Sequence, residues 1–135
     1  MILAEILRAA GEPSRLRILN LLRFGDICVS DLQGVLGLSQ STVSRHLSVL
    51  RHAGLVSDRR DGARVVYSLA TGDSPDVAGL FQMLDGCYPT QEGLRRDFET
   101  LEAAVRDGKC RLEIRGETRA GGHAAHRTPG EDSRL

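Results

Sequence analysis

The chain has 135 residues, and its 18 basic and 18 acidic side chains give a formal net charge of zero. Hydrophobic residues make up 41% and charged residues 27% of the sequence, a composition typical of a single soluble globular domain with a modest core. No apolar run approaches the roughly 18 residues of a membrane span, no signal peptide opens the chain, and the cysteines are too few and too widely spaced for a disulfide framework. We therefore expect a cytoplasmic protein with reduced thiols and no membrane partner.

Two helices are expected at the N-terminus. Pro13 suits the first position of the second one, which we expect to run to about Phe24. The first helix has an apolar stripe formed by Ile2, Leu3, Ile6, Leu7 and Ala10.

A pair of short helices joined by a tight turn follows. The apolar spacing in Val29–Gly37 predicts a helix that ends at Gly37, because glycine readily adopts the left-handed conformation that often ends helices. Ser39 suits the N-cap of the next helix, and Gly54 ends that helix. Two helices connected in this way form a helix-turn-helix.

The second helix of this pair has two different faces. Val43, Leu47 and Leu50 form one apolar stripe with spacing i, i+4, i+7, and the opposite face carries hydroxyl, Arg and His side chains. No acidic residue occurs from Ser39 to Ser57, and residues 39–70 contain five Arg against two Asp, a balance of +3. Such a face suits contact with phosphates and base edges.

A hairpin with basic residues near its tip comes next. Asp61-Gly62 lies between two β-rich runs, which favours a two-residue type I′ turn at this pair. With this loop Arg59 faces Arg64, and the repulsion costs stability unless a phosphate lies beside the two side chains. A helix-turn-helix followed by such a hairpin is a winged helix, so the predicted fold is mainly α with a small β-hairpin.

Two more helices, 76–87 and 91–106, are expected in the C-terminal half. Their apolar stripes and that of the first helix suit a homodimer surface, although they could instead only cover the monomer's own core. A twofold dimer reads two DNA half-sites about 34 Å apart. Apolar residues become rare from Gly108 onward, so we expect a DNA-binding and dimerisation domain, 1–107, followed by a polar and disordered tail, 108–135.

Six stretches of the sequence match one known family in order: Gly11–Leu19, Asp26–Leu32, Ser39–Leu47, Leu50–Val56, Arg59–Gly62 and Val66–Leu69. On these residues the chain resembles the ArsR/SmtB family of bacterial winged-helix repressors, which leave DNA when an effector binds. The resemblance covers residues 5–70. It implies a homodimer that pairs through its N-terminal and C-terminal helices, double-stranded operator DNA as a partner, and a small inorganic effector.

The expected DNA contacts come from the N-terminal half of the recognition helix, which enters the major groove first, and from the wing. Arg45 suits a guanine and Gln40 an adenine, and each such pair contributes about 1–3 kcal/mol of discrimination. His46 lies at the edge of the buried stripe, where a structural hydrogen bond is as reasonable as a phosphate contact. The predicted set is Gln40, Ser41, Thr42, Ser44, Arg45, His46, Arg59, Arg60 and Arg64.

The family's metal sites are only partly retained. Arsenic-sensing members carry three cysteines at the start of the first helix of the pair, where three thiolates suit trivalent arsenic or antimony. Here only Cys28 remains, and Ser30 and Gln33 occupy the other two positions, so that site cannot work as it does in those relatives. The zinc-sensing arrangement needs His residues on the last helices, and residues 76–106 contain none.

A second arrangement brings Cys28 together with Cys87 and Cys110, within a subunit or across the dimer. It would be a thiolate site for trivalent arsenic, antimony or another soft metal, with no obligatory cofactor. Two alternatives are a redox or persulfide switch through Cys28 and Cys87, and structural cysteines with an organic effector or none.

Other functional classes are less well supported by the sequence. It contains no Ser/His/Asp set, Gly-rich phosphate loop or paired-carboxylate signature, so we expect no enzyme. A winged helix that binds a protein rather than DNA is the remaining alternative. Such a module has no need of an acid-free helix face beside an Arg-rich hairpin.

Overall fold

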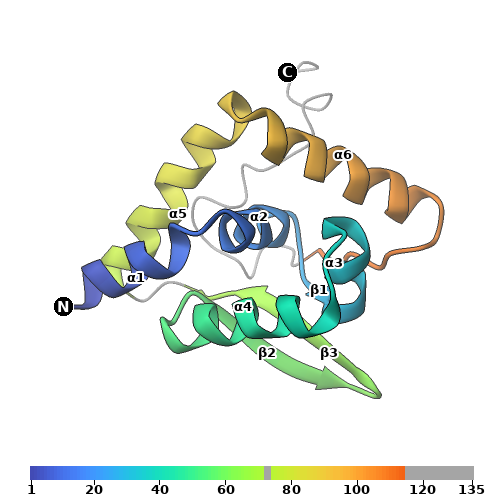
Figure 1. Cartoon of the computed structure of the whole chain (residues 1–135), viewed down its shortest axis with the longest axis horizontal. Helices are drawn as coiled ribbons and strands as arrows, with labels where there is room; N and C mark the ends of the chain where they lie inside the picture. Colours follow the sequence, from blue (N-terminus) through green and yellow to red (C-terminus); the bar gives the residue numbers. More distant parts are fainter. Residues whose placement is uncertain (72–73, 115–135) are drawn as a thin grey trace.

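A computed structural model describes residues 1–71 and 74–114 of the chain. Its elements in chain order (Figure 1) are α1 (Ile2–Ala10), α2 (Pro13–Leu22), β1 (Ile27–Cys28), α3 (Val29–Leu36), α4 (Gln40–His52), β2 (Val56–Asp61), β3 (Arg64–Leu69), α5 (Pro75–Cys87), the 3₁₀ helix η1 (Tyr88–Thr90) and α6 (Glu92–Arg106). The three strands form one antiparallel sheet in the order β1-β3-β2. This mostly helical fold with a small hairpin confirms the predicted winged helix-turn-helix class.

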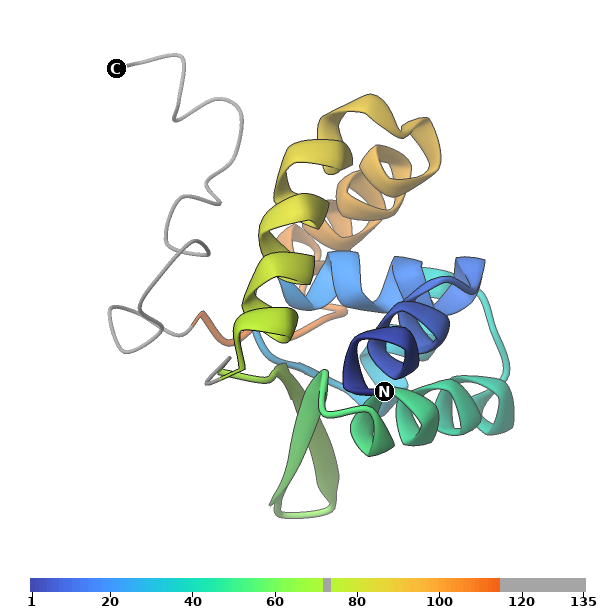
Figure 2. The same cartoon turned by 90° about the vertical axis from the view of Figure 1, so that its left-hand side faces the viewer.

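Helix α2 lies at the centre of the molecule. Ile18, Leu19, Leu21 and Leu22 are fully buried in it, and the helix contacts α1, α3, α4, α6 and β3. A helix with apolar residues on more than one side is buried from several directions. The other helices therefore surround α2, and α4 and the β2–β3 hairpin lie on the opposite side of it from α5 and α6 (Figures 1 and 2).

The helix-turn-helix forms for the local reasons expected. Gly37 ends α3 in the left-handed region at φ 70°, and its N–H donates to the Gln33 carbonyl. The Ser39 hydroxyl accepts the Thr42 N–H at 3.2 Å and caps α4, a contact that typically contributes about 1 kcal/mol. Val43, Leu47 and Leu50 are fully buried, so the opposite face of α4 points outward.

The hairpin turns one residue later than predicted. Asp61 pairs with Arg64, and Arg59 faces Val66 rather than Arg64, so the loop is Gly62-Ala63. Gly62 has φ 65° and no non-glycine residue in the described part of the chain has a positive φ, which fits a type II′ turn with glycine first rather than a type I′ turn. Asp61 and Arg64 then form an ion pair of 3.5 Å, and the expected repulsion between facing arginines is absent.

The apolar stripe of helix α6 covers the monomer's own core, which is the second of the two roles considered for it. Leu94, Phe98 and Leu101 are buried. The Arg17 guanidinium of α2 donates to both carboxylate oxygens of Asp97 on α6, at 2.8 and 3.0 Å. This bidentate ion pair holds α6 against α2. The apolar stripe of α6 therefore packs on the core of its own protomer.

The folded part of the chain extends beyond the predicted boundary at residue 107. Gly108, at φ 75°, reverses the chain, Cys110 is buried, and Glu113 forms an antiparallel bridge with Asp26. Residues 108–114 of the predicted tail thus pack on the domain, and residues 115–135 lie outside the described residues. None of the described helices has the length and apolar character needed to cross a membrane.

Candidate nucleic-acid interface

Helix α4 presents a polar face without acids. Gln40, Ser41, Ser44 and Arg45 are exposed on it, and Thr42 is partly exposed. The hairpin projects from the body beside this helix (Figure 2). The structure therefore places these predicted contact residues on the same side of the molecule as the wing.

His46 has a different position from its neighbours. Its side chain is buried, and its Nδ1 atom lies 3.3 Å from Nη1 of Arg15. The Arg15 Nε–H also donates to the Ala9 carbonyl at 2.5 Å, so His46 joins α4 to the α1–α2 connection. This placement supports the structural role considered for His46 and argues against a contact with phosphate.

Two of the three predicted wing arginines form ion pairs with acidic side chains. Arg59 forms ion pairs with Asp26, at 3.1 Å, and with Glu113. Arg64 lies 3.5 Å from Asp61 and 3.7 Å from Glu113. Within residues 1–71 and 74–114, Arg60 forms no ion pair, and it is exposed on β2.

Sequence reasoning did not include Arg51 among the contact residues. It is exposed in the last turn of α4 and forms an ion pair of 3.3 Å with Asp58 of β2. Its position inside the acid-free stretch was a usable signal. Asp26 and Glu113 had no comparable signal, because they meet the wing only through the tertiary fold.

A hollow of about 360 Å³ lies between α3, α4 and the wing. Gln40 and Ser44 line it from α4, Arg64 from β3, and Cys28 from the start of α3. Hydrogen bonding to Cys28 raises the pKa of Arg64 above its ordinary value. The Cys28 thiol and the Arg64 guanidinium therefore lie together within the predicted DNA-facing region.

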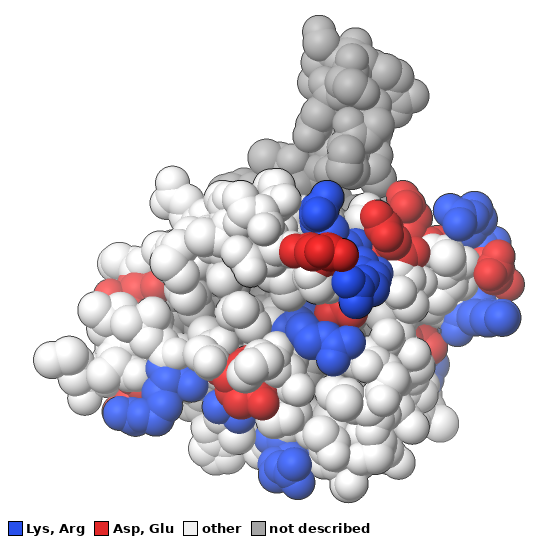
Figure 3. Space-filling model, turned by 45° about the horizontal axis from the view of Figure 1, so that its top comes forward, with Lys and Arg blue, Asp and Glu red and all other residues white. Residues whose placement is uncertain are grey.

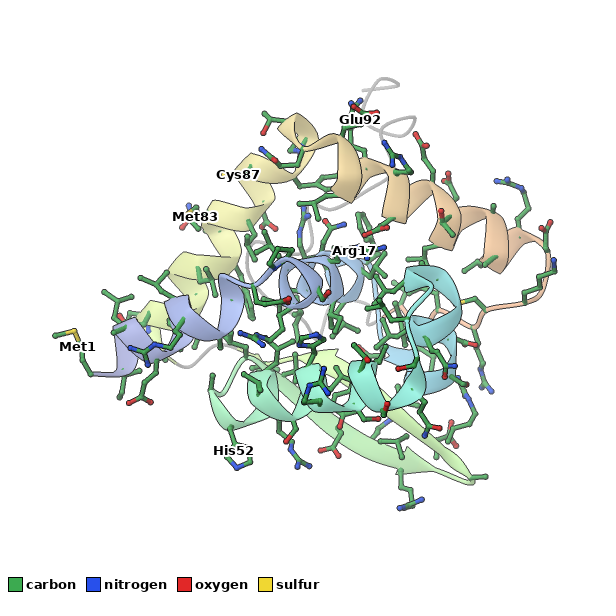
Figure 4. All side chains as sticks on the ribbon, viewed as in Figure 1. Met1, Arg17, His52, Met83, Cys87 and Glu92 are labelled. Atoms are coloured by element: carbon green, nitrogen blue, oxygen red, sulfur yellow. The ribbon has the colours of Figure 1, made fainter. Side chains whose placement is uncertain are left out.

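The three cysteines do not come together in one protomer. Cys28 and Cys110 are buried and Cys87 is exposed, at the end of α5 far from the start of α3 (Figure 4). Among the described residues, no group of three or more His, Cys, Asp or Glu side chains could hold a metal ion. The predicted three-cysteine site is therefore not assembled within a single subunit, because α5 carries Cys87 away from the other two.

Cys28 and Cys110 remain as a pair. Burial raises the pKa of Cys110 to about 12, and Asp31 and Cys28 act in the same direction. Cys110 also lines a hollow of about 180 Å³ with Ser30 and Asp31, and the Cys28 sulfur lies 3.3 Å from the Ser30 hydroxyl. Both thiols therefore adjoin the first turn of α3.

The end of the molecule formed by α1 and α5 carries exposed apolar side chains. Ile2 is 65%, Leu7 48% and Met83 52% exposed, and α1 contacts α5. Figure 3 shows a mostly uncharged surface at this end, whereas acidic and basic side chains alternate over the α6 end.

Comparison with known proteins agrees with this geometry. Residues 12–58 match the family model described as bacterial regulatory protein, arsR family. The chain is 45% identical over 82 residues to the uncharacterized HTH-type transcriptional regulator MJ1325 of Methanocaldococcus jannaschii, covering 60% of this chain and 92% of that protein. It is 50% identical over 66 residues to the HTH-type transcriptional regulator NmtR of Mycobacterium tuberculosis, covering 49% of this chain and 55% of NmtR.

The fold is similar to that of a solved homodimeric protein. The winged helix-turn-helix DNA-binding domain of Mb0332 from Mycobacterium bovis, described as a possible ArsR-family transcriptional regulator, superposes with a TM-score of 0.55 at 34% identity, covering 62% of this chain and 75% of that one. The chain spans only 52–66% of the length of several curated relatives. The match to the family model runs from the residue before α2 through the helix-turn-helix to the beginning of β2.

Proposed function

Because the chain belongs to the ArsR/SmtB family of helix-turn-helix transcriptional regulators, we propose that it is a dimeric repressor that binds operator DNA and leaves it when an effector binds. The observation that carries this proposal is the exposed acid-free face of α4, with Gln40, Ser44 and Arg45, beside the wing. Its ligand is chromosomal DNA, so the proposed place of action is the cytoplasm. Binding of the purified chain to duplexes from the upstream region of its own gene tests the proposal.

We place the dimer contact at the exposed apolar residues of α1 and α5. The leucine and isoleucine side chains there are worth about 1.5–3 kcal/mol each when fully buried. A symmetric contact would use each of them twice. The Mb0332 domain is homodimeric, which supports a dimer of this chain.

Leu7→Glu is expected to convert the dimer to a monomer and to weaken DNA binding strongly, because it brings one carboxylate from each protomer into the apolar contact. Sedimentation velocity measures the change. Val105→Glu is the matched control, since Val105 is a 37% exposed apolar residue on α6. A Leu7→Glu variant that remains dimeric would show that the contact lies elsewhere.

For the effector we propose a thiophilic ligand, such as trivalent arsenic, antimony or another soft metal, bound through Cys28 and Cys110. The burial of both thiols beside the first turn of α3 supports this pair. An effector that prefers the DNA-free geometry by about 1–3 kcal/mol would lower DNA affinity 5–150-fold. A redox or persulfide switch through the same thiols is the second candidate. A chemical change at these thiols would reach α4, because the thiols adjoin α3 and α3 packs against α4.

Cys28→Ser and Cys110→Ser are each expected to abolish the release of DNA by effector, while Cys87→Ser responds like the parent chain. Fluorescence anisotropy of labelled operator, challenged in turn with trivalent arsenic, antimony, zinc, cadmium, persulfide and an oxidant, measures the response and separates the two candidates. Loss of the response in Cys87→Ser would indicate a site built across the dimer. Full responses in all three variants would rule out a thiol effector site.

A further inference from the structure

Residues Cys110–Ile114, which we call the C-terminal strap, run back along the domain after α6. The Arg111 N–H donates to the Asp31 carboxylate at 3.0 Å. The backbones of Asp26 and Glu113 exchange two hydrogen bonds, of 2.8 and 3.0 Å. The strap is thus hydrogen-bonded both to α3 and to the segment that leads into β1.

The strap lies against Gly25, where the domain leaves space for it. A Cβ atom on Gly25 would lie 2.8 Å from the Glu113 carbonyl oxygen and 2.8 Å from Cδ1 of Leu112. Such distances are too short for real contacts, so the strap can lie here only because residue 25 has no side chain. Leu112 also packs against the hydrophobic core.

The seated strap places one carboxylate beside an arginine from each of the two strands of the wing. Glu113 forms ion pairs with Arg59 of β2 and with Arg64 of β3, and Asp26 forms a second pair with Arg59 at 3.1 Å. Nη1 of Arg64 and Oε2 of Glu113 are buried and face each other at 3.7 Å, and neither atom has a hydrogen-bond partner. The strap therefore engages Arg59 through a hydrogen-bonded ion pair and Arg64 through charge.

A phosphate and a carboxylate compete for the same guanidinium donors, because both accept its forked N–H groups. Building on the proposed function, we propose that the C-terminal strap is an intramolecular competitor of DNA: Glu113, together with Asp26, withholds Arg59 and Arg64 from the phosphates. Release of the strap removes one acidic partner from each of these two arginines, leaving Arg59 with Asp26 and Arg64 with Asp61, so both become easier for the duplex to bind. Glu113 is then a determinant of DNA affinity although it lies outside the helix-turn-helix and the wing.

This arrangement also gives the proposed effector a route to the DNA-binding surface. Cys110 begins the strap and Cys28 directly precedes α3, so a ligand that joins the two sulfurs holds the strap in place. The seated strap keeps the wing arginines paired with acids, which favours the DNA-free state. The direction of this coupling matches a repressor that is released by its effector.

Glu113→Gln in the full chain tests the strap. We expect the variant to bind a labelled duplex more tightly than the parent, with a steeper dependence of log affinity on log salt, because each added phosphate contact contributes a slope of about −0.9. One added phosphate contact per protomer, two per dimer, should enlarge its advantage about tenfold between 200 and 50 mM salt. Anisotropy titrations at several salt concentrations measure both effects.

Two further variants make the test specific. Glu92→Gln is the matched control, because it makes the same charge change at an exposed ion pair on α6, 3.0 Å from Arg96, and is expected to bind like the parent. In an Arg59→Ala, Arg64→Ala background, Glu113→Gln should no longer raise affinity. An equal gain in Glu92→Gln, or equal affinity and slope in Glu113→Gln and the parent, would overturn the strap proposal while leaving the proposed function standing.

The labelling of Cys110 provides a readout that does not involve DNA. In chains that carry Cys28→Ser and Cys87→Ser, a maleimide should modify Cys110 several-fold faster when Glu113 is Gln, and faster also in Gly25→Ala, which displaces the strap without a change of charge. Unchanged labelling rates in both variants would overturn strap release. A parent chain that binds no duplex at any salt concentration would instead overturn the proposed function itself.

Discussion

Arg45→Ala is expected to weaken operator binding by about 2–6 kcal/mol in the dimer, because each of the two protomers loses a contact worth about 1–3 kcal/mol. Arg45 is exposed on the acid-free face of α4, and it forms no ion pair within residues 1–71 and 74–114. Its guanidinium is therefore available to bind a base edge without first leaving an acidic partner. Anisotropy titrations with operator and with a random duplex measure the loss of affinity and of specificity.

Arg95→Ala is the matched control for this prediction. Arg95 is an exposed arginine on α6, on the opposite side of the molecule from α4 (Figure 1). We expect it to leave operator binding within a factor of two of the parent, since it lies outside the contact surface. If Arg45→Ala retained full affinity, α4 would not be the reading helix, and the interpretation as a protein-interaction module would gain support.

Asp85→Asn is expected to lower the free energy of unfolding by about 3–5 kcal/mol, because it removes the carboxylate that offsets a buried charge. The Arg23 side chain is only 1% exposed, and its Nε lies 2.8 Å from the Asp85 carboxylate. Burial lowers the pKa of Arg23, and the charge of Asp85 acts against that shift. Urea denaturation followed by circular dichroism measures the loss as a lower midpoint at constant slope.

Two comparisons isolate the buried pair. Glu92→Gln breaks an exposed i,i+4 ion pair and should cost only about 0.3–0.5 kcal/mol. Joint replacement of Arg23 by Met and Asp85 by Leu should recover most of the lost stability, since neither charge of this pair then remains buried. A loss below 1 kcal/mol in Asp85→Asn would mean that Asn20 and the Tyr88 ring, which lies 4.6 Å from the Arg23 guanidinium carbon, are sufficient to hold this charge.

The Arg23–Asp85 pair also matters for the proposed dimer. It joins α2, at the centre of the core, to α5, which carries the exposed Met83. Loosening this connection should therefore weaken dimerisation as well as folding. In the same way, the bidentate Arg17–Asp97 pair holds α6 over the monomer's core, which keeps Leu94, Phe98 and Leu101 of α6 buried in the protomer.

Local signals in the sequence were enough to predict the helix-turn-helix. The ends of α3 and α4 depend on Gly37, which takes a left-handed conformation, and on Ser39, which caps the next turn. The burial of Val43, Leu47 and Leu50 follows from helical periodicity alone. These features involve residues a few positions apart, so the chain determines them before any distant contact forms.

Distant contacts decided the rest. The choice between Asp61-Gly62 and Gly62-Ala63 as the hairpin loop depended on the pairing of the whole hairpin. Moving the loop by one residue moves the partner of every β2 residue by two positions along β3, as for Arg59, which faces Val66 instead of Arg64. Whether the α6 stripe met a partner chain or its own core depended on Arg17, 80 residues away from Asp97. The contacts of Glu113 with the wing likewise join residues 49 and 54 positions apart.

The amino-acid sequence by itself thus determined the reading helix and the acid-free composition of its outer face, because backbone conformation and periodicity are local properties. Only the tertiary structure decided which arginines of that surface are already paired with acids and which cysteines lie near each other. Charge pairing and thiol proximity depend on distances across the fold, and no spacing along the chain encodes those distances.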